Sequence, residues 1–238
     1  MTSLKANDYS NPEYIGSKFR KKRFKFFEEN WLSQSKQTTI IDIGGTVQFW
    51  VNENYHKRTD VVITVVNLRY EEKQYSNITT VVGNACDLSQ FADGSFDISF
   101  SNSLIEHLHT KENQIKMAKE AMRVGKCFFI QTPNRYFPIE PHFKFPLFQF
   151  LPEFIKIFLQ TQTHLINGVK YERAYAKNIV NEIRLLTRHE MKEFFPKSNL
   201  YTERFIGIPK SYTSYSFPKY NLIASKSNTR ISYHHSCY

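Results

Sequence analysis

The amino-acid sequence predicts an α/β fold in which a doubly wound, mostly parallel β-sheet carries helices on both faces. Three short runs rich in β-branched residues, at positions 38–43, 61–66 and 78–82, have the length and composition of buried strands. The first run leads into Gly44 and Gly45, which is typical of a strand end followed by a tight turn. The first two runs are spaced as a strand-helix-strand unit requires if the second strand is to return parallel.

The remaining core elements follow in the order that such a sheet needs. We expect strands at 96–100 and 127–131 and connecting helices at 47–55, 111–124 and 184–195. The second of these helices places Ile115, Ala118 and Met122 on one apolar face, and Gly125 is expected to end it in a left-handed conformation. Thr187 is a suitable N-cap within the last helix.

A basic, aromatic helix is predicted at residues 18–32, before the first strand. Phe24, Phe27 and Trp31 recur at helical spacing among many lysines and arginines. One interpretation packs these aromatic rings on the domain and leaves the basic face in water. The other uses the basic face on a polyanion such as RNA or on an anionic membrane surface. The net charge of +10 is compatible with both.

A proline-rich loop follows the fifth strand. Prolines 133, 138 and 141 exclude a regular helix or a central strand from residues 131–143, and this loop should lie at the carboxyl edge of the sheet. The next segment, 145–159, is apolar and aromatic. It is expected to cap the site as a helical lid, to hold a hydrophobic substrate or to dip into a membrane surface, and we favour the helical lid.

The composition indicates the size and setting of the protein. With 238 residues and 41% hydrophobic content, the chain can bury one good core. Cys86, Cys127 and Cys237 show no disulfide or metal-ligand spacing, so we expect a reducing, cytoplasmic location and no metal site. We see neither a signal peptide nor an apolar run long enough to span a membrane. The sequence does not indicate an oligomeric state.

Several motifs in order resemble the class I S-adenosylmethionine-dependent methyltransferases with a type 11-like domain. They are Gly83 to Leu88, Asp93 to Asp97 and Glu106-His107-Leu108. The resemblance covers residues 38–135 well and extends more loosely to about 225. It implies a Rossmann-like sheet of seven strands with an antiparallel closing strand, and we assign closing strands to 201–206 and 220–224, joined by an aromatic, Ser-rich connection. The domain then spans 38–225, with an N-terminal extension at 1–37, a substrate-side loop and lid at 133–170 and a polar tail at 226–238.

The same resemblance implies S-adenosylmethionine as the cofactor and a set of residues that contact it. Asp42 would face the amino acid end of the cofactor, Gly44 and Gly45 would allow its close approach, and Asn67 would reach the ribose. The remaining expected cofactor contacts are Leu68, Asn84, Ala85, Ser101 and Asn102. Asn67 and Asn84 stand where the family usually has acids, and Gly44-Gly45-Thr46 replaces its Gly-x-Gly. The turn also lacks the Gly-x-Gly-x-x-Gly of dinucleotide-dependent oxidoreductases, which argues against that class.

The substrate side is expected at the carboxyl edge of the sheet. His107, Tyr136 and His142 are the candidate catalytic residues, although each also suits a packing role. In-line methyl transfer from a sulfonium needs alignment above all, and a base only for a protonated nucleophile. We expect a small-molecule, lipid-linked or glycan acceptor. The alternatives are an RNA- or membrane-associated methyltransferase and a pseudoenzyme that binds the cofactor without catalysis.

Overall fold

A seven-stranded sheet forms the centre of the protein. The computed structural model describes residues 15–32, 37–72, 75–166 and 168–217. In that part of the chain, the sheet has the order β3-β2-β1-β4-β5-β9-β8. Its strands are β1 (Thr38–Ile43), β2 (Val61–Asn67), β3 (Ile78–Val82), β4 (Phe96–Asn102), β5 (Gly125–Pro133), β8 (Asn199–Phe205) and β9 (Ile208–Tyr215). β1 to β5 are parallel, and β9 is antiparallel to both β5 and β8. The predicted fold class is confirmed.

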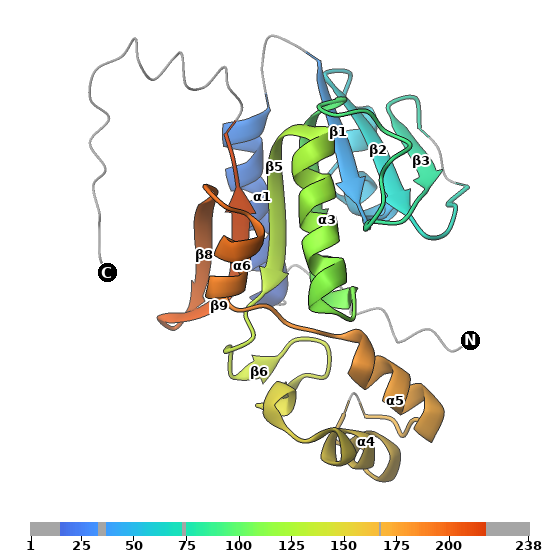
Figure 1. Ribbon diagram of the computed structural model, residues 1–238, viewed down its shortest axis with the longest axis vertical. Coiled ribbons are helices and arrows are strands. Elements are labelled where there is room, and N and C mark those ends of the chain that lie inside the picture. The colour runs from blue at the N-terminus through green and yellow to red at the C-terminus, as the bar shows by residue number, and fades with distance from the viewer. Residues whose placement is uncertain (1–14, 33–36, 73–74, 167, 218–238) are drawn as a thin grey trace.

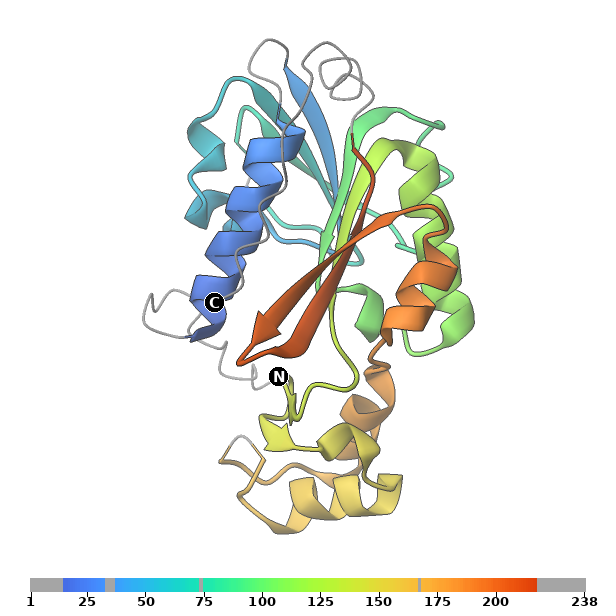
Figure 2. The same cartoon turned by 90° about the vertical axis from the view of Figure 1, so that its left-hand side faces the viewer.

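Helices cover both faces of this sheet (Figures 1 and 2). They are α1 (Ile15–Trp31), α2 (Val47–Asn52), α3 (Lys111–Val124), α4 (Glu153–Gln162), α5 (Arg173–Glu182) and α6 (Arg188–Phe194), with short 3₁₀ turns η1 (Tyr55–Lys57), η2 (Ile105–His107) and η3 (Phe148–Phe150). α1 and α2 contribute to one apolar cluster, and α3 and α6 contribute to another. The two clusters lie on opposite faces of the sheet, as a doubly wound fold requires.

The aromatic side of α1 packs on the sheet. Phe24, Phe27 and Trp31 are buried, and the Phe27 ring centroid lies 5.0 Å from that of Phe100 and 5.2 Å from that of Phe129. This confirms the packing interpretation of the aromatic residues. The basic face is not entirely in water, however. Arg23 is buried against the sheet, whereas the α1 lysines at 18, 21, 22 and 25 are exposed.

A separate helical unit lies beyond the carboxyl ends of the parallel strands (Figure 1). It contains a small hairpin of β6 (Ile139–Glu140) and β7 (Phe145–Pro146), then α4 and α5. We call residues 138–183 the lid. The lid has its own apolar cluster, whose buried members are Phe143, Phe148, Ile166 and Val180. α4 lies where the sequence predicts a helical lid, whereas α5 is not predicted.

Several sequence-based boundaries are wrong. β9 occupies the stretch that we assigned to a connection, because its polar Ser211, Thr213 and Ser214 are buried within the sheet. The strand predicted at 220–224 lies outside the described residues. Gly125 is not a left-handed cap: its φ is −100°, and it begins β5 in an extended conformation.

The helix predictions also need adjustment. α2 ends at Asn52, since Asn54 adopts a positive φ of 63°. The last helix begins at Arg188, where Thr187 forms the N-cap of a capping box with Glu190, as predicted for Thr187. On α3 the fully buried face contains Ala118 with Met117 and Ala121, while Ile115 and Met122 are only partly buried. No helix among the described residues has the length and hydrophobicity to cross a membrane.

Candidate functional site

The turn after β1 holds a buried carboxyl group against Gly45. Gly44 has a φ of +75°, and a Cβ on Gly45 would lie 1.7 Å from Asp42 Oδ2. The indole Nε1 of Trp50 donates a hydrogen bond of 2.7 Å to Asp42 Oδ2, while Asp42 Oδ1 is buried without a partner in the part of the chain that the structure describes. Burial is the main cause that raises the Asp42 pKa to about 7. The turn therefore presents a buried oxygen that a bound cation or donor would satisfy.

Asn67 holds the same turn from the end of β2. Its Nδ2 donates to the carbonyl oxygen of Gly45 at 3.0 Å, and its Oδ1 accepts from the backbone N–H of Leu68 at 2.8 Å. Leu68 itself is 73% exposed. Glu71 accepts a hydrogen bond from the backbone N–H of Val47, at the start of α2. Asn67 thus has a structural use in the turn, and its contact with a ribose stays a prediction.

The other expected cofactor residues lie at the carboxyl ends of β3 and β4. Asn84 Oδ1 accepts from the backbone N–H of Cys86 in a tight turn, and Ala85 is part of the core. The Ser101 hydroxyl is buried and donates to the carbonyl oxygen of Ile43 at 2.8 Å, which ties β4 to the β1 turn. Asn102 Oδ1 accepts from the Arg23 guanidinium at 2.9 Å. Ser101 therefore lies beside the glycine turn, whereas Asn102 contacts α1.

A cluster of carboxylates and imidazoles follows directly after β4. The chain turns at Leu104, whose side chain packs on Gly44: a Cβ there would lie 2.4 Å from its methyl carbons. Glu106 comes next and is fully buried, with Oε2 accepting from the Thr132 hydroxyl of β5 at 2.9 Å. The rings of His107 and His142 meet edge to face with centroids 4.8 Å apart. The structure thus brings together two of the three predicted catalytic residues.

Two further glutamates hold these imidazoles. Glu140 Oε1 lies 2.7 Å from His142 Nδ1, and Glu182 Oε1 lies 3.1 Å from His107 Nδ1. Burial opposes the charged form of His142, but the hydrogen bond and negative charge of Glu140 outweigh it and raise the His142 pKa. The hydrogen bond from His107 is the main cause that lowers the Glu182 pKa. His107 and His142 were singled out by sequence, whereas Glu182 was not.

Tyr136 lies apart from this cluster. Its side chain is 62% exposed, and its ring stacks on Phe150 with centroids 6.0 Å apart. Its backbone N–H donates to Asn134 Oδ1. The described contacts of Tyr136 are those of a surface loop residue, and a catalytic role for it stays a prediction.

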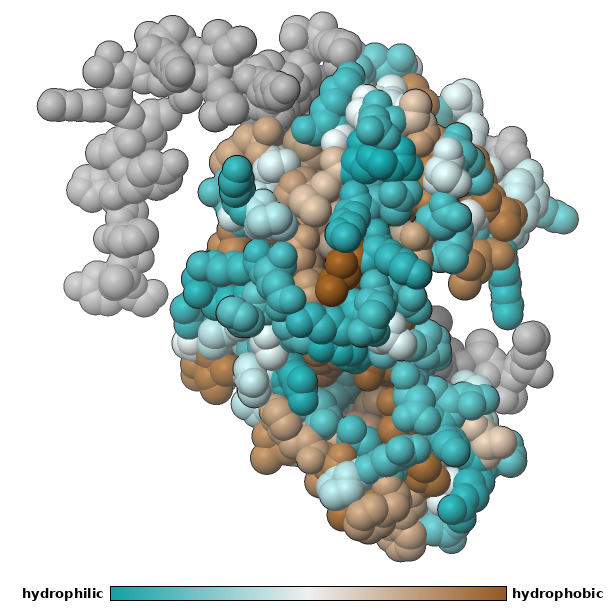
Figure 3. All heavy atoms as spheres, viewed as in Figure 1, coloured by the Kyte–Doolittle hydropathy of each residue, from teal (hydrophilic) through white to brown (hydrophobic). Residues whose placement is uncertain are grey.

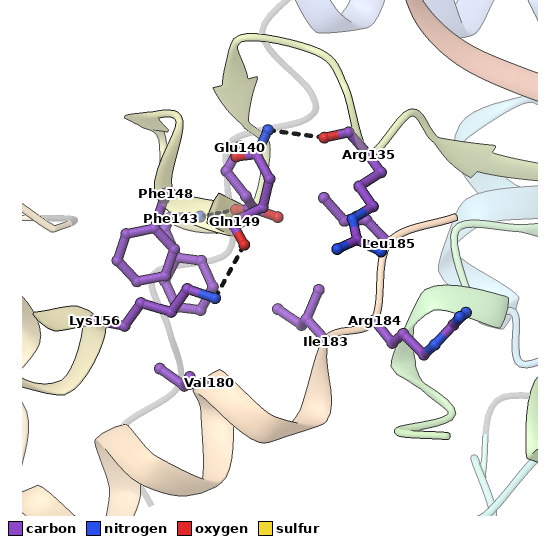
Figure 4. Close-up of a pocket in the computed structure, with 10 residues that line it drawn as sticks. All are labelled: Arg135, Glu140, Phe143, Phe148, Gln149, Lys156, Val180, Ile183, Arg184 and Leu185. Atoms are coloured by element: carbon purple, nitrogen blue, oxygen red, sulfur yellow. Dashed lines mark hydrogen bonds between the residues drawn. The ribbon is translucent and has the colours of Figure 1, made fainter. Parts of the chain in front are cut away.

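A pocket of about 320 Å³ opens between the lid and the sheet edge (Figure 4). Its lining comes from the loop after β5, the lid and the α5–α6 connection: Arg135, Glu140, Phe143, Phe148, Gln149, Lys156, Val180, Ile183, Arg184 and Leu185. Gln149 Nε2 donates to the carbonyl oxygen of Arg135 at 2.9 Å, and Lys156 Nζ donates to that of Gln149 at 3.1 Å. Burial is the main cause that lowers the Lys156 pKa. The pocket thus combines apolar walls with cationic groups and the Glu140 carboxylate.

The outer surface of the lid carries exposed apolar side chains, several of them aromatic. Figure 3 shows hydrophobic residues gathered over the lower part of the molecule, where the lid lies. Phe154 and Phe158 on α4 are 73% and 57% exposed. Peripheral membrane contact through this surface stays a prediction.

Comparison with known proteins identifies the central region of the chain. Residues 36–127 match the family model described as a methyltransferase domain. The match indicates a methyltransferase domain in this region, in agreement with the motifs that resemble class I S-adenosylmethionine-dependent methyltransferases. S-adenosylmethionine is the methyl donor that this match implies.

Individual relatives are more distant from this chain. Two proteins of Mycobacterium tuberculosis strains, both described as uncharacterized, are 27% identical over 121 residues, or 50% of this chain. That stretch is only 40% of their own length. A structure of a possible exported protein from Bordetella parapertussis has a TM-score of 0.51 at 10% identity, covering 84% of this chain and 68% of that one. A SAM-dependent methyltransferase from Methanosarcina mazei has a TM-score of 0.44 at 15% identity, covering 77% and 93%.

The turn after β1 has features that fit S-adenosylmethionine. The buried, unpartnered Oδ1 of Asp42 can accept a hydrogen bond from the cofactor's ammonium group, and the turn at Gly44 and Gly45 lets the backbone approach. When bound, the cofactor supplies an electrophilic methyl group. We assign its amino acid end to Asp42 and its adenosine to the ends of β2 and β3 as predictions from the family resemblance.

Sequence reasoning missed two parts of the site. Glu106 appears in the quoted motif, but nothing in the sequence shows that its side chain is buried. Glu182 lies in α5, far along the chain from His107, and it carries no motif of its own. Because α5 is polar on most sides, its sequence does not distinguish Glu182 from the other polar residues of the helix. The packing of the lid is what brings Glu182 to His107.

Proposed function

We propose that the protein is a methyltransferase whose acceptor binds in the pocket between the lid and the carboxyl edge of the sheet. The observation that carries this proposal is the packing of Leu104 on Gly44. Through it, the turn assigned to the cofactor adjoins η2, which leads into the Glu106–His107 cluster. Glu140 belongs both to that cluster and to the pocket lining. Donor, polar cluster and acceptor pocket would then be contiguous.

The pocket supports a small acceptor group. A volume of about 320 Å³ lies at the lower end of the range for small-molecule sites. It suits a small metabolite or the terminal unit of a glycan or lipid-linked intermediate. Phe143, Phe148 and Val180 provide apolar contact, while Arg135 and Lys156 favour an acceptor with negative or hydrogen-bond-accepting groups.

In this proposal the protein chiefly aligns the acceptor with the methyl group and excludes water. Methyl transfer breaks the methyl–sulfur bond as the acceptor atom forms a new bond in line with it, so orientation supplies much of the rate. A hydroxyl acceptor also has to lose a proton, which the His107 and His142 cluster can accept. We also propose a cytoplasmic location, which the free thiols of Cys86 and Cys127 support.

Titration calorimetry tests the donor part of the proposal. We expect the protein to bind S-adenosylmethionine and S-adenosylhomocysteine but not NAD. Asp42→Ala should weaken binding at least tenfold, or about 1.4 kcal/mol, because it removes the buried acceptor oxygen. Gln48→Ala, at an exposed position on α2, is the control and should bind as the wild type does. The absence of binding by the wild type, or equal binding by Asp42→Ala, would contradict the proposal.

A further inference from the structure

Glu106, His107 and His142 are arranged like the ligands of a metal ion. Each offers one ligand atom, and these atoms all lie within 4.8 Å of one another. Glu106 is fully buried, and its Oε1 has no hydrogen-bond partner among the described residues. Oε1 lies 4.0 Å from His142 Nε2, which is too far for a hydrogen bond. A buried carboxylate oxygen left in this state is costly unless a cation satisfies it.

The two imidazoles are held as metal-binding histidines usually are. In metal sites, the ring nitrogen that does not bind the ion is typically hydrogen-bonded to a carboxylate, which fixes the tautomer and the ring orientation. Glu140 has this relation to His142 Nδ1, and Glu182 has it to His107 Nδ1. His142 then directs Nε2 toward Glu106. An outer shell of carboxylates is therefore present around the candidate ligands.

The charge of the cluster also favours a cation. Glu106, Glu140 and Glu182 come together here, and Glu106 and Glu140 are almost completely buried. Within the described part of the chain, the ion-pair partners of these three carboxylates are His107 and His142 and no lysine or arginine. Neutral imidazoles would leave three negative charges together, which a divalent ion would largely offset.

We propose that Glu106, His107 and His142 bind a divalent transition-metal ion. Two imidazoles and one carboxylate suit Zn²⁺, Fe²⁺, Mn²⁺ or Co²⁺, whereas Mg²⁺ and Ca²⁺ prefer oxygen ligands alone. Metal–ligand bonds of about 2.0–2.2 Å require the ligand atoms to lie closer together than the most distant pair does here. Side-chain rotations that move these atoms by about 1 Å would bring all three within bonding distance of one ion. Three protein ligands leave open positions for water or a substrate oxygen.

The location links the ion to the turn after β1. Glu106 follows Leu104, which packs on Gly44, and Glu140 extends from the cluster into the lid pocket. An ion here would coordinate a hydroxyl oxygen of the acceptor and lower the pKa of that hydroxyl beside the methyl donor, and it would replace the imidazoles as the group that promotes loss of the proton. This last step rests on the proposed function, whereas metal binding by itself does not.

Metal binding to the full chain, without cofactor or acceptor, tests the proposal directly. Protein freed of metal with a chelator is titrated with Co²⁺, followed by visible absorption, and with Zn²⁺, followed by calorimetry. We expect one ion per cluster and an increase in Tm on binding. Glu106→Gln and His142→Ala should each weaken binding at least tenfold. His189→Ala, which removes an exposed histidine of α6, should leave it within threefold.

The C-terminal sequence requires a second control. His234, His235 and Cys237 are themselves potential metal ligands, so the titrations are repeated in a variant with all three replaced by alanine. The proposal predicts that this variant retains the site and that Glu106→Gln in the same background removes it. Circular dichroism confirms folding of each variant, and His142→Ala replaces Glu106→Gln if the latter does not fold. Loss of binding with the three C-terminal replacements, or unchanged binding in both cluster variants, would overturn the proposal.

Discussion

Nη1 of Arg23 on α1 donates hydrogen bonds of 2.8 Å to both carboxylate oxygens of Glu203 on β8. Both side chains are buried, and Glu203 also accepts from the Ser211 hydroxyl of β9. Nη2 of Arg23 extends the network to Asn102 at the end of β4. A helix from the start of the chain is thus fastened to the closing strands and to the carboxyl edge of the sheet.

We therefore expect Arg23→Ala to lower the free energy of unfolding by about 3–5 kcal/mol, because it leaves the Glu203 carboxylate buried without its charged partner. Urea denaturation measures this change. Lys25→Ala on the exposed side of α1 is the matched control and should change stability by less than about 0.5 kcal/mol. A loss below about 1 kcal/mol for Arg23→Ala would show that the pair does not fasten the helix.

The example shows what the sequence could and could not predict about α1. The spacing of Phe24, Phe27 and Trp31 predicts both the helix and its buried face, since periodicity is a local property. The burial of Arg23 depends on Glu203, 180 positions further along the chain. β9 escaped prediction for a related reason: its buried serines and threonine do not show the apolar alternation by which strands are recognised.

Asp42 should give the protein a characteristic pH dependence. Its pKa in the folded protein is about 7, against an ordinary value of 3.8, mainly because of burial. Between these values the unfolded chain loses the proton before the folded chain does, so stability falls as pH rises, by up to about 1.4 kcal/mol per pH unit. Asp42→Asn removes this titration while keeping an oxygen for Trp50.

Urea denaturation of the cofactor-free protein at pH 5, 6, 7 and 8 checks this expectation. The stability of Asp42→Asn relative to the wild type should increase with pH up to about 7 and then level off. Parallel stability curves for the two proteins across this range would mean that Asp42 is ionised throughout, contrary to the expectation.

Asn67→Asp separates the structural role of this residue from its predicted role at the cofactor. The substitution removes the Nδ2 donor and places a carboxylate beside the Gly45 carbonyl oxygen, so we expect a loss of about 1–3 kcal/mol in unfolding free energy. A carboxylate accepts hydrogen bonds from ribose hydroxyls more strongly than an amide, so affinity for S-adenosylmethionine should rise. Calorimetry and urea denaturation measure the two effects. Asn52→Asp, exposed on α2, is the control. Weaker binding of S-adenosylmethionine together with lower stability would show that Asn67 stabilises the turn but does not contact the ribose.

The candidate site could be predicted only in pieces. His107 and His142 were each expected at the carboxyl edge of the sheet, because they follow the fourth and fifth strands. That their rings meet, 4.8 Å apart, depends on the path of the proline-rich loop and on Glu140, which turns His142 back toward η2. The expectation that the chain has no metal site stays a prediction. It rests on the absence of a ligand cluster in the sequence, and ligands drawn from separate loops give no such sequence spacing.

Glu140 should control the opening of the lid without controlling the stability of the sheet. Its carboxylate accepts from the backbone N–H groups of His142 and Phe143 at 2.7 and 2.6 Å as well as contacting the His142 ring. The lid cluster around Phe143 is separate from the two clusters of the sheet, so the lid can open as a local unit. Glu140→Gln loses the charge and one acceptor, at a cost of about 1.5–3 kcal/mol.

Amide hydrogen exchange followed by mass spectrometry should show at least tenfold faster exchange in the lid of Glu140→Gln, with rates in β1 and β4 unchanged. Glu153→Gln, exposed at the start of α4, should leave both regions as in the wild type. Equal acceleration in the lid and the sheet would instead show that the two unfold together.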